Sequence, residues 1–226
     1  MADVHLYYAQ GACSLAPHIL LHETSLPFTV TALSVKSGFP SESEHINPKK
    51  RVPVLVINGQ TITENPAVML VISQLVPEKS LMGRTDVDQV RVLEWMNWVS
   101  GTLHGQAFAM VLRPARFSDD ETLYPAIKEK GLKTVKDCFE QIEAWLGKIG
   151  NESGGVFTLG NGESFTAVDG YLYVFYRWGM GMKMGMQGLY PCYTRLARAL
   201  EGRESVRKAL AAEGLEKVVV TGEVRL

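Results

Sequence analysis

The hydrophobic positions near the start of the chain follow two different periods. Val4, Leu6 and Tyr8 recur at every second position, which is the pattern of a short strand. Across residues 14–24 the apolar positions recur as in a helix, and Pro17 falls in its first turn, where proline is tolerated. This part of the chain therefore predicts a strand, a turn and a helix.

Short patterns continue to about residue 77. Apolar residues at positions 28, 30 and 32 predict a second strand, and Asn58-Gly59 between two further runs predicts a β-hairpin. Asn65 and Pro66 predict the N-cap and the first turn of a helix, which we expect to end near Leu75. The order strand, helix, strand, then strand, strand, helix predicts a thioredoxin-like α/β domain.

From about residue 86 the patterns are helical. Apolar spacing predicts helices over residues 86–113, 135–149, 166–178, 193–200 and 206–213. Thr166-Ala-Val-Asp169 predicts a capping box at the start of one of them. We therefore expect an α/β thioredoxin-like domain over residues 1–79, a linker at about 80–86 and an all-α domain over 87–226.

Charge and hydropathy exclude several classes of partner. The 226 residues carry a formal net charge of -1, so nothing in the overall charge attracts nucleic acid or an anionic membrane surface. The N-terminus lacks the basic-then-apolar order of a signal peptide, and no apolar run reaches the roughly 18 residues that a spanning helix needs. We expect a cytoplasmic protein without nucleic-acid or membrane partners.

Cysteines and histidines give no pattern of a disulfide framework or a metal site. Cys13, Cys138 and Cys192 are odd in number and far apart, which favours a reducing compartment. His18 and His22 are spaced to share a helix face, but no third ligand accompanies them. We expect no metal.

Cys13 is the first candidate for chemistry, because it stands where the first predicted helix begins. Backbone N–H groups and the positive end of the helix dipole can stabilise a thiolate there. The following residues do not form a C-x-x-C motif, so a mixed disulfide with a small thiol is possible but an internal disulfide is not. The sequence leaves open a second interpretation, in which Cys13 is buried and inert.

A candidate anion site follows the predicted hairpin. Glu64 could pair with an ammonium group, and the helix N-terminus at Asn65 could bind a carboxylate, a combination that suits an amino-acid head group. An ordinary Asn cap beside a surface Glu explains the same residues. If the Val52-Pro53 bond is cis, the backbone of Val52 could also bind an extended peptide-like ligand.

Two further features lie in the helical half. His104 comes late in the long helix, with Asn97 about two turns earlier, and could donate to or orient a sulfur atom. A histidine that merely packs near the helix end is the alternative. The methionines of residues 179–188 could line an adaptable apolar pocket or simply fill gaps.

Together these segments resemble one family. The stretches LYYAQGACSLAPHIL (6–20), NPKKRVPVL (47–55), TENPA (63–67), EWMNW (94–98) with Leu103-His104, and FTAVDGY (165–171) occur in the order found in beta-class, bacterial-type glutathione transferases. The resemblance covers essentially the whole chain. It implies a two-domain glutathione transferase fold, with glutathione bound in the thioredoxin-like domain.

The resemblance also implies roles for individual residues. Cys13 would face the glutathione sulfur and could form a mixed disulfide with it, with the hydroxyls of Ser14 and Tyr8 nearby and His104 approaching from the helical domain. The implied glutathione-binding residues are Val52, cis-Pro53, Glu64, Asn65 and Asn97.

The function implied is conjugation of glutathione to electrophilic, largely apolar small molecules, as in detoxification. We expect the acceptor pocket near Phe108, Met110, Arg113 and Trp178, and a homodimer. Two alternatives remain open: a glutathione-dependent thiol transferase or disulfide reductase acting through Cys13, and a non-catalytic binding protein that kept the fold.

The chain departs from the family pattern at three places around the glutathione site and also in its C-terminal tail. Gly105 follows His104 where lysine is common, and the loop over residues 36–45 is short, so the resemblance does not identify the basic partner of the glycyl carboxylate. Asn65 replaces the usual Gly or Ser but still offers an N–H group. The tail over residues 218–226 runs past the usual terminus.

Overall fold

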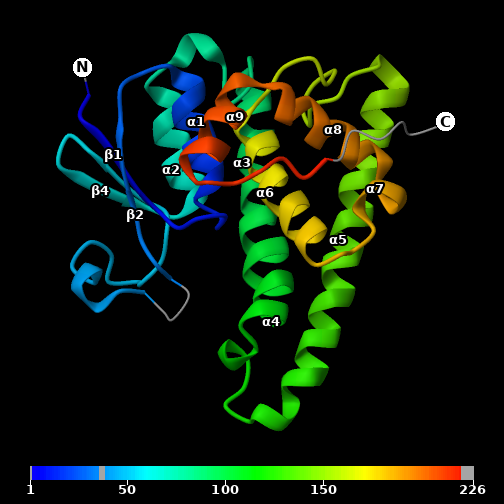
Figure 1. The fold of residues 1–226 in the computed structure, drawn as a ribbon. Helices are drawn as coiled ribbons and strands as arrows, with labels where there is room; N and C mark the ends of the chain where they lie inside the picture. The colour runs from blue at the N-terminus through cyan, green and yellow to red at the C-terminus, as the bar shows by residue number, and fades with distance from the viewer. Residues whose placement is uncertain (1, 36–38, 220–226) are drawn as a thin grey trace.

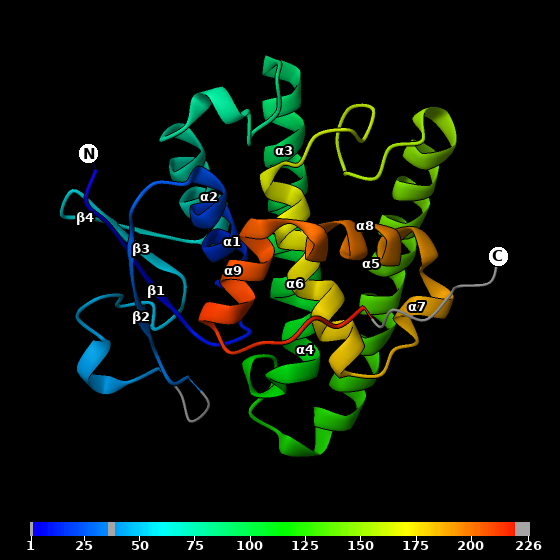
Figure 2. The ribbon, with the colours of Figure 1, turned by 45° about the horizontal axis from the view of Figure 1, so that its top comes forward.

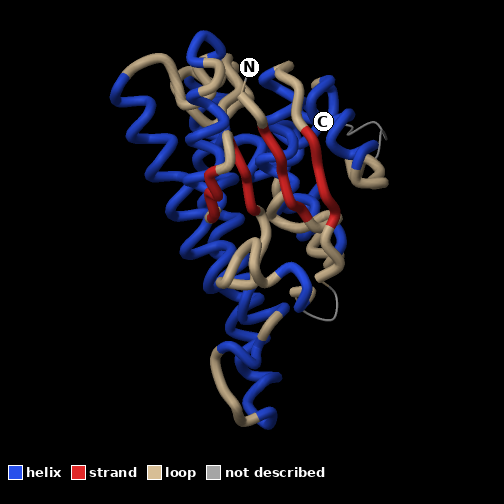
Figure 3. The backbone as a smooth tube through the Cα atoms, turned by 90° about the vertical axis from the view of Figure 1, so that its left-hand side faces the viewer, coloured by secondary structure: helices blue, strands red, loops and turns tan. Residues whose placement is uncertain are grey.

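The N-terminal part of the molecule is a small sheet with helices on one side. The computed structural model describes residues 2–35 and 39–219. In chain order, the elements of this part are β1 (Val4–Tyr8), α1 (Leu15–Thr24), β2 (Thr29–Ala32), β3 (Val54–Ile57), β4 (Gln60–Thr63) and α2 (Asn65–Gln74). Figure 3 views the chain from the sheet side and shows the strands in front of the helices.

The sheet has the strand order β2-β1-β3-β4. β1 pairs parallel with β2 and antiparallel with β3, and β3 pairs antiparallel with β4. Asn58 and Gly59 close the hairpin with positive φ angles of 49° and 77°, which this type of tight turn requires. This is the thioredoxin-like arrangement that the sequence predicts.

The rest of the described chain is helical. Its α-helices are α3 (Asp86–Trp98), α4 (Ala109–Leu112), α5 (Tyr124–Ser153), α6 (Ala167–Gly181), α7 (Met186–Leu189), α8 (Pro191–Gly202) and α9 (Glu204–Ala212). A π-helical stretch, Val99–Phe108, joins α3 to α4 without a break. Figure 1 shows this long run beside α5, the two extending below the rest of the molecule.

The helix predictions are confirmed in position, with two local differences. Glu64, not Asn65, is the N-cap of α2, so Asn65 occupies the first helical position. The long helix also contains the π-helical stretch, which the period of its apolar residues does not reveal. π-helical turns are frequent at functional sites because they shift the side chains that follow them.

The two parts of the chain share one core around α1. This helix packs against the sheet and also against α6 and α9, and Figure 2 shows α9 beside it. Gly170 of α6 faces Ile19 of α1, with room for close approach of the two helices. The core therefore fixes the N-terminal sheet relative to the helices that carry the other half of the site.

A buried capping box starts α6, as the sequence predicts. Asp169 is fully buried and accepts hydrogen bonds from the backbone N–H (2.7 Å) and hydroxyl (3.0 Å) of Thr166. Its other oxygen accepts from the backbone N–H (2.7 Å) and hydroxyl (2.6 Å) of Thr158. Asp169 thus ties the loop before α6 to the helix start.

The domain boundary at about 80–86 stays a prediction, although the stretch between Lys79 and Asp86 carries no helix or strand. Of the short loop over residues 36–45 and the tail over 218–226, residues 36–38 and 220–226 lie outside the described part. Within the tail, the backbone N–H of Val218 donates to Glu201 at 2.7 Å.

Candidate functional site

Two adjoining cavities lie between the sheet and the long helical run. The outer cavity, of about 590 Å³, is lined by residues including Phe39, Lys50, Phe108, Leu112, Arg113 and Trp178. The inner cavity, of about 400 Å³, is lined by residues including Asn47, Pro53, Glu64, Asn65, Ser100 and Tyr171. Both cavities are also lined by Cys13, Arg51, Val52, His104 and Arg116. The shared residues, which we call the junction, come from both halves of the chain.

Cys13 lies at the junction, in the turn before α1. Its side chain is only 7% exposed, and its thiol donates to the backbone carbonyl oxygen of Val52 at 3.5 Å. Burial raises the pKa of the Cys13 thiol to about 11, although the Asn65 side chain and backbone N–H groups at the helix start act to lower it. Desolvation therefore outweighs the stabilisation of a thiolate that we expect from the helix N-terminus. The Cys13 sulfur carries its proton.

The predicted hydroxyl groups do not reach the sulfur. The Ser14 hydroxyl is buried and folds back onto the turn, accepting from the Ala9 backbone N–H (3.0 Å) and donating to the Ala9 carbonyl (3.2 Å). The Tyr8 hydroxyl donates to the carbonyl of Ala212 at 3.5 Å, and its ring contacts His18. Neither residue is among those that line the cavities, so the geometry gives no support to a role for either at the sulfur.

The N-terminus of α2 faces the inner cavity. The Glu64 carboxylate, 58% exposed, pairs with the Lys49 ammonium at 2.9 Å. Asn65 is buried; its amide nitrogen donates to the Tyr171 hydroxyl at 3.4 Å, and its carbonyl oxygen has no partner. The unpartnered acceptor suits a positively charged group, and the N–H groups at the helix start suit a negatively charged one. The site is therefore suited to a ligand that carries an ammonium and a carboxylate.

His104 lies in the π-helical stretch, with its ring 5.5 Å from that of Trp178 and 5.6 Å from that of Phe175. Burial, together with the positive charges of Arg116 and Arg51, lowers the pKa of His104 to about 4. The ring is therefore neutral at physiological pH and can donate only through one N–H group. Asn97 is exposed and is not among the residues that line the cavities.

The Val52-Pro53 peptide bond is cis, as the resemblance implies. Val52 lines both cavities and Pro53 lines the inner one.

Three of the four residues expected in an acceptor pocket line the outer cavity: Phe108, Arg113 and Trp178. The indole N–H of Trp178 donates to the Gly11 carbonyl at 2.9 Å, which fixes the ring. Met110 instead faces α5, where its Cβ lies close to Gly131. Met110 misses the cavity because it lies on the side of the run that packs against α5.

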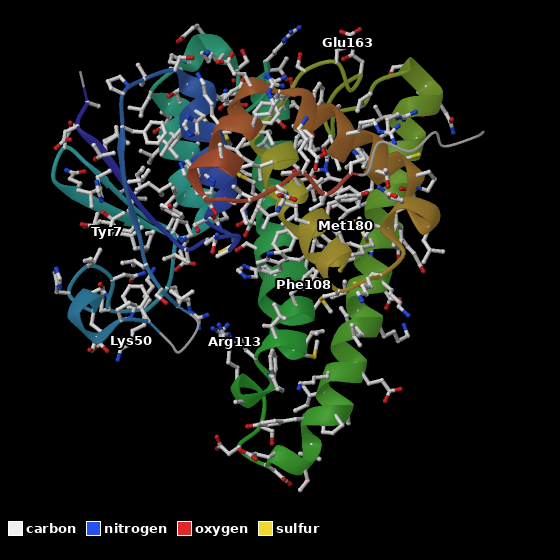
Figure 4. All side chains as sticks on the ribbon, viewed as in Figure 1. Tyr7, Lys50, Phe108, Arg113, Glu163 and Met180 are labelled. Carbon is white, nitrogen blue, oxygen red and sulfur yellow. The ribbon has the colours of Figure 1, made fainter. Side chains whose placement is uncertain are left out.

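The methionine segment fills gaps at the end of α6. Met186 is buried, and its sulfur lies beside Gly179, which also faces Phe139. None of the methionines of residues 179–188 is among the residues that line the two cavities. Figure 4 shows Met180 on α6, away from the opening between Lys50 and Arg113.

Sequence reasoning missed two cations at the junction, Arg51 and Arg116. Arg51 ends the basic run that precedes Val52, and Arg116 lies in the short 3₁₀ turn Pro114–Arg116 after α4. The pKa of Arg116 is lowered by burial first and then by the positive charges of Arg51 and Arg113, which line the outer cavity with it. The basic run before the proline was the signal available in the sequence.

Neither a metal site nor a membrane span is found in the described part of the chain. No cluster of three or more His, Cys, Asp or Glu side chains there could hold a metal ion. Among the described helices, none combines the length and the apolar character needed to cross a bilayer.

Comparison with known proteins assigns the family. Residues 2–73 match the model of the glutathione S-transferase N-terminal domain. The chain is 30% identical to glutathione S-transferase GstA of Escherichia coli O157:H7 over 216 residues, covering 93% of this chain and 99% of that protein. It is 27% identical to glutathione S-transferase GST-4.5 of Xanthomonas campestris over 217 residues, covering 93% and 98% of the two.

Solved structures agree. A sphingomonad glutathione S-transferase in complex with glutathione matches with a TM-score of 0.79 and 31% identity, covering 94% of this chain and all of that one. A bacterial beta-class enzyme from Sphingomonas chungbukensis matches with a TM-score of 0.77 and 27% identity, over 94% of this chain and 100% of that one. The fold, the junction and these relatives together show that the chain belongs to the bacterial-type glutathione S-transferase family and is a transferase.

Proposed function

We propose that the protein conjugates glutathione, bound in the inner cavity, to an electrophilic small molecule with an apolar body, bound in the outer cavity. The observation that carries this proposal is the junction: Cys13, Val52 and His104 line both cavities. A tripeptide thiol in one cavity and an acceptor in the other would bring sulfur and carbon together there. Such positioning converts a bimolecular step into an effectively unimolecular one.

Glutathione has a glutamyl end with an ammonium and a carboxylate, and a glycyl end with a second carboxylate. We propose that the Glu64 carboxylate binds the ammonium, and that the α2 N-terminus with Asn65 binds the glutamyl carboxylate. The unpartnered side-chain oxygen of Asn65 is an acceptor and supports placing the ammonium here, while the backbone N–H groups at the helix start would donate to the carboxylate. The backbone of Val52 would bind the middle of the tripeptide.

The glycyl carboxylate needs a cation, and Gly105 stands where a lysine is common in the family. Arg51 and Arg116 both line the inner cavity and are positively charged, whereas Glu64 is negatively charged. We propose that one of the two arginines binds the glycyl carboxylate. A guanidinium suits a carboxylate because it can donate two parallel hydrogen bonds. Both residues lie at the junction, so either would also keep positive charge near the sulfur.

The nucleophile would be the glutathione thiolate. Its thiol proton goes to solvent, the sulfur forms a bond to the electrophilic carbon, and the leaving group departs with the electron pair of the broken bond. Arg51 and Arg116 would favour the thiolate electrostatically. The Cys13 thiol, held protonated by burial, would donate a weak hydrogen bond to it, and neutral His104 would orient the sulfur through its ring N–H.

Thiol transfer through Cys13 is the second candidate function. It is supported by the position of the Cys13 sulfur at the junction, but the pKa of about 11 leaves little thiolate to attack a disulfide at neutral pH. A non-catalytic binding role is the third candidate. Catalysis is favoured over binding alone, because the junction residues line both cavities and two substrates could meet there.

One experiment separates these candidates. We would measure conjugation of glutathione to an aryl halide and reduction of a glutathione mixed disulfide for the unmodified protein, Cys13→Ala and Ser14→Ala. Conjugation that persists in Cys13→Ala, with disulfide reduction weak throughout, is the expected result. Disulfide reduction that dominates and disappears in Cys13→Ala would favour thiol transfer. The absence of both reactions, without glutathione binding, would leave a binding protein.

A homodimer, a cytoplasmic location and a role in detoxification stay predictions. The family resemblance supports the dimer, and the exposed apolar side chains of Val87 and Val90 on α3 are available for an interface. Light scattering of the purified protein would give the mass of the assembly and so test it.

A further inference from the structure

The outer cavity is lined by four cationic side chains: Lys50, Arg51, Arg113 and Arg116. Among the described residues that line it there is no Asp or Glu. This imbalance stands out because the whole chain is close to neutral, with a formal net charge of -1. A cavity that binds only neutral apolar molecules would gain no affinity from these cations. The charge of the lining therefore indicates an anionic ligand.

The four cations come from both sides of the cavity. Lys50 and Arg51 precede β3, whereas Arg113 and Arg116 follow α4 at the end of the long helical run. Figure 4 shows Lys50 on the sheet side and Arg113 on the helical side, with Phe108 on the earlier part of the run, nearer the middle of the molecule. An anion bound between them would be approached by positive charge from both halves of the molecule.

Most of this charge is not neutralised within the protein. Lys50 pairs with Glu44 at 2.7 Å, but no ion pair links Arg51, Arg113 or Arg116 to an acidic side chain in the part of the chain that the structure describes. The lowered pKa of Arg116, caused partly by Arg51 and Arg113, is consistent with like charges held together without a counter-ion. Guanidinium groups in this state favour a carboxylate, sulfonate or phosphate.

Glutathione accounts for only part of the charge. Its glycyl carboxylate would take one cation at the junction, Arg51 or Arg116, which also line the inner cavity. Lys50 and Arg113 line only the outer cavity. Their two positive charges are therefore available to bind the acceptor.

The rest of the outer cavity is apolar. Phe39, Phe108, Leu112 and Trp178 supply its hydrophobic wall. The fully buried ring of Phe108 packs T-shaped against that of Trp178, at 5.1 Å and 78°, and supports the partly exposed indole, whose flat surface is available to a ring of the ligand. An apolar wall with cations around it is complementary to a molecule with an apolar body and a negatively charged end.

We propose that the acceptor is an anionic electrophile: an aromatic or other apolar body that carries a carboxylate, bound with that carboxylate at Arg113 and Lys50. This inference rests on the proposed function and narrows its substrate class. The anion would position the electrophilic carbon toward the junction, so it contributes to binding and to orientation in the same step.

The test compares a charged acceptor with its neutral counterpart. Chlorodinitrobenzoate, with chlorine para to the carboxylate, and the corresponding benzamide both react with glutathione: the thiol proton goes to solvent, the sulfur–carbon bond forms, and chloride leaves with its electron pair. For each acceptor, kcat/KM is divided by the rate constant of the uncatalysed reaction. This division removes the difference in intrinsic reactivity between the two rings.

We expect this corrected kcat/KM to be at least about tenfold higher for the benzoate than for the benzamide, because a charged hydrogen bond is lost in the amide. Arg113→Gln should lower the benzoate-to-benzamide ratio about five- to tenfold, and Lys50→Gln should lower it less because Lys50 already pairs with Glu44. Arg91→Gln is the matched control, since Arg91 pairs with Glu94 on α3 outside the cavity, and it should leave the ratio unchanged. Added salt should lower the ratio in the unmodified protein.

The outcomes separate the inference from the proposed function. If both acceptors react and the ratio is near one, or if Arg113→Gln leaves a high ratio intact, the anionic acceptor is wrong and the transferase stands. If neither reacts and glutathione does not bind, the proposed function fails. If neither reacts but glutathione binds, calorimetry with unreactive dinitrobenzoate and dinitrobenzamide decides: equal affinities overturn the inference, and tighter benzoate binding that Arg113→Gln weakens upholds it.

Discussion

The thiol of Cys13 and the backbone carbonyl of Val52 meet at 3.5 Å, at the point where the two cavities join. A protonated cysteine suits this contact, because the carbonyl oxygen can only accept. The pKa of about 11 agrees with this protonation state. Cys13 is therefore a buried, protonated part of the wall of the site.

Alkylation of Cys13 tests this description. At pH 8 a thiol with a pKa of about 11 is ionised in only about one molecule in a thousand, so labelling by iodoacetamide should be slow and should accelerate up to high pH. Mass spectrometry of the labelled peptide gives the rate, and Cys13→Ala identifies the peptide signal. A labelling rate that levels off below about pH 8 would show a stabilised thiolate instead.

The free energy of unfolding should decrease as the pH is lowered, because of His104. Its pKa lies near 6.5 in the unfolded chain and is lowered to about 4 in the folded one, so below pH 6.5 the unfolded chain takes up a proton that the folded protein does not. The unfolding free energy therefore decreases as pH falls from 6.5 toward 4. His104→Gln should lose about 1–2 kcal/mol less between pH 7 and pH 5 than the unmodified protein does, measured by urea unfolding. Equal losses in the two proteins would place the pKa of His104 near its ordinary value.

The two capping boxes predict different costs for the same substitution. Asp169→Ala should destabilise the protein by about 3–5 kcal/mol, because it leaves the buried donors of Thr158 and Thr166 without partners. The capping box at the start of α3 is exposed, and its Asp88 carboxylate accepts from the backbone N–H groups of Thr85 (3.0 Å) and Arg84 (3.1 Å). Asp88→Ala removes these bonds where water can replace them and should cost about 1 kcal/mol. Thermal and urea unfolding of both variants give the comparison. Similar losses of unfolding free energy in the two variants would mean that burial does not determine how strongly the capping box of α6 stabilises the protein.

Much of the fold follows from local patterns. Asn58-Gly59 predicts the hairpin because few residues adopt its positive φ angles, and the period of the residues from Val135 to Ile149 predicts α5 because one face of it must be buried. Local order of this kind needs no knowledge of the rest of the chain. The π-helical stretch is different, since it depends on how the long run packs beside α5 and α6.

The site is less predictable, because side-chain direction depends on tertiary contacts. Ser14 stands next to Cys13 in the sequence, yet its hydroxyl bonds to Ala9 and faces away from the cavities. Arg51 and Arg116 line the same two cavities only because the fold brings the segment before β3 and the turn after α4 to the junction. Sequence patterns identify Cys13 and Glu64, but the charge of the outer cavity becomes visible only when the segments are placed together.

The most direct test of the central claim is a calorimetric titration with glutathione. The unmodified protein should bind one glutathione per chain, and Glu64→Gln should weaken binding about tenfold by removing the charged partner of the glutamyl ammonium. Glu163→Gln changes an exposed carboxylate on a distant loop, as Figure 4 shows, and should bind as the unmodified protein does. If the unmodified protein binds no glutathione, or if Glu64→Gln binds it equally well, the inner cavity is not the glutathione site that we propose.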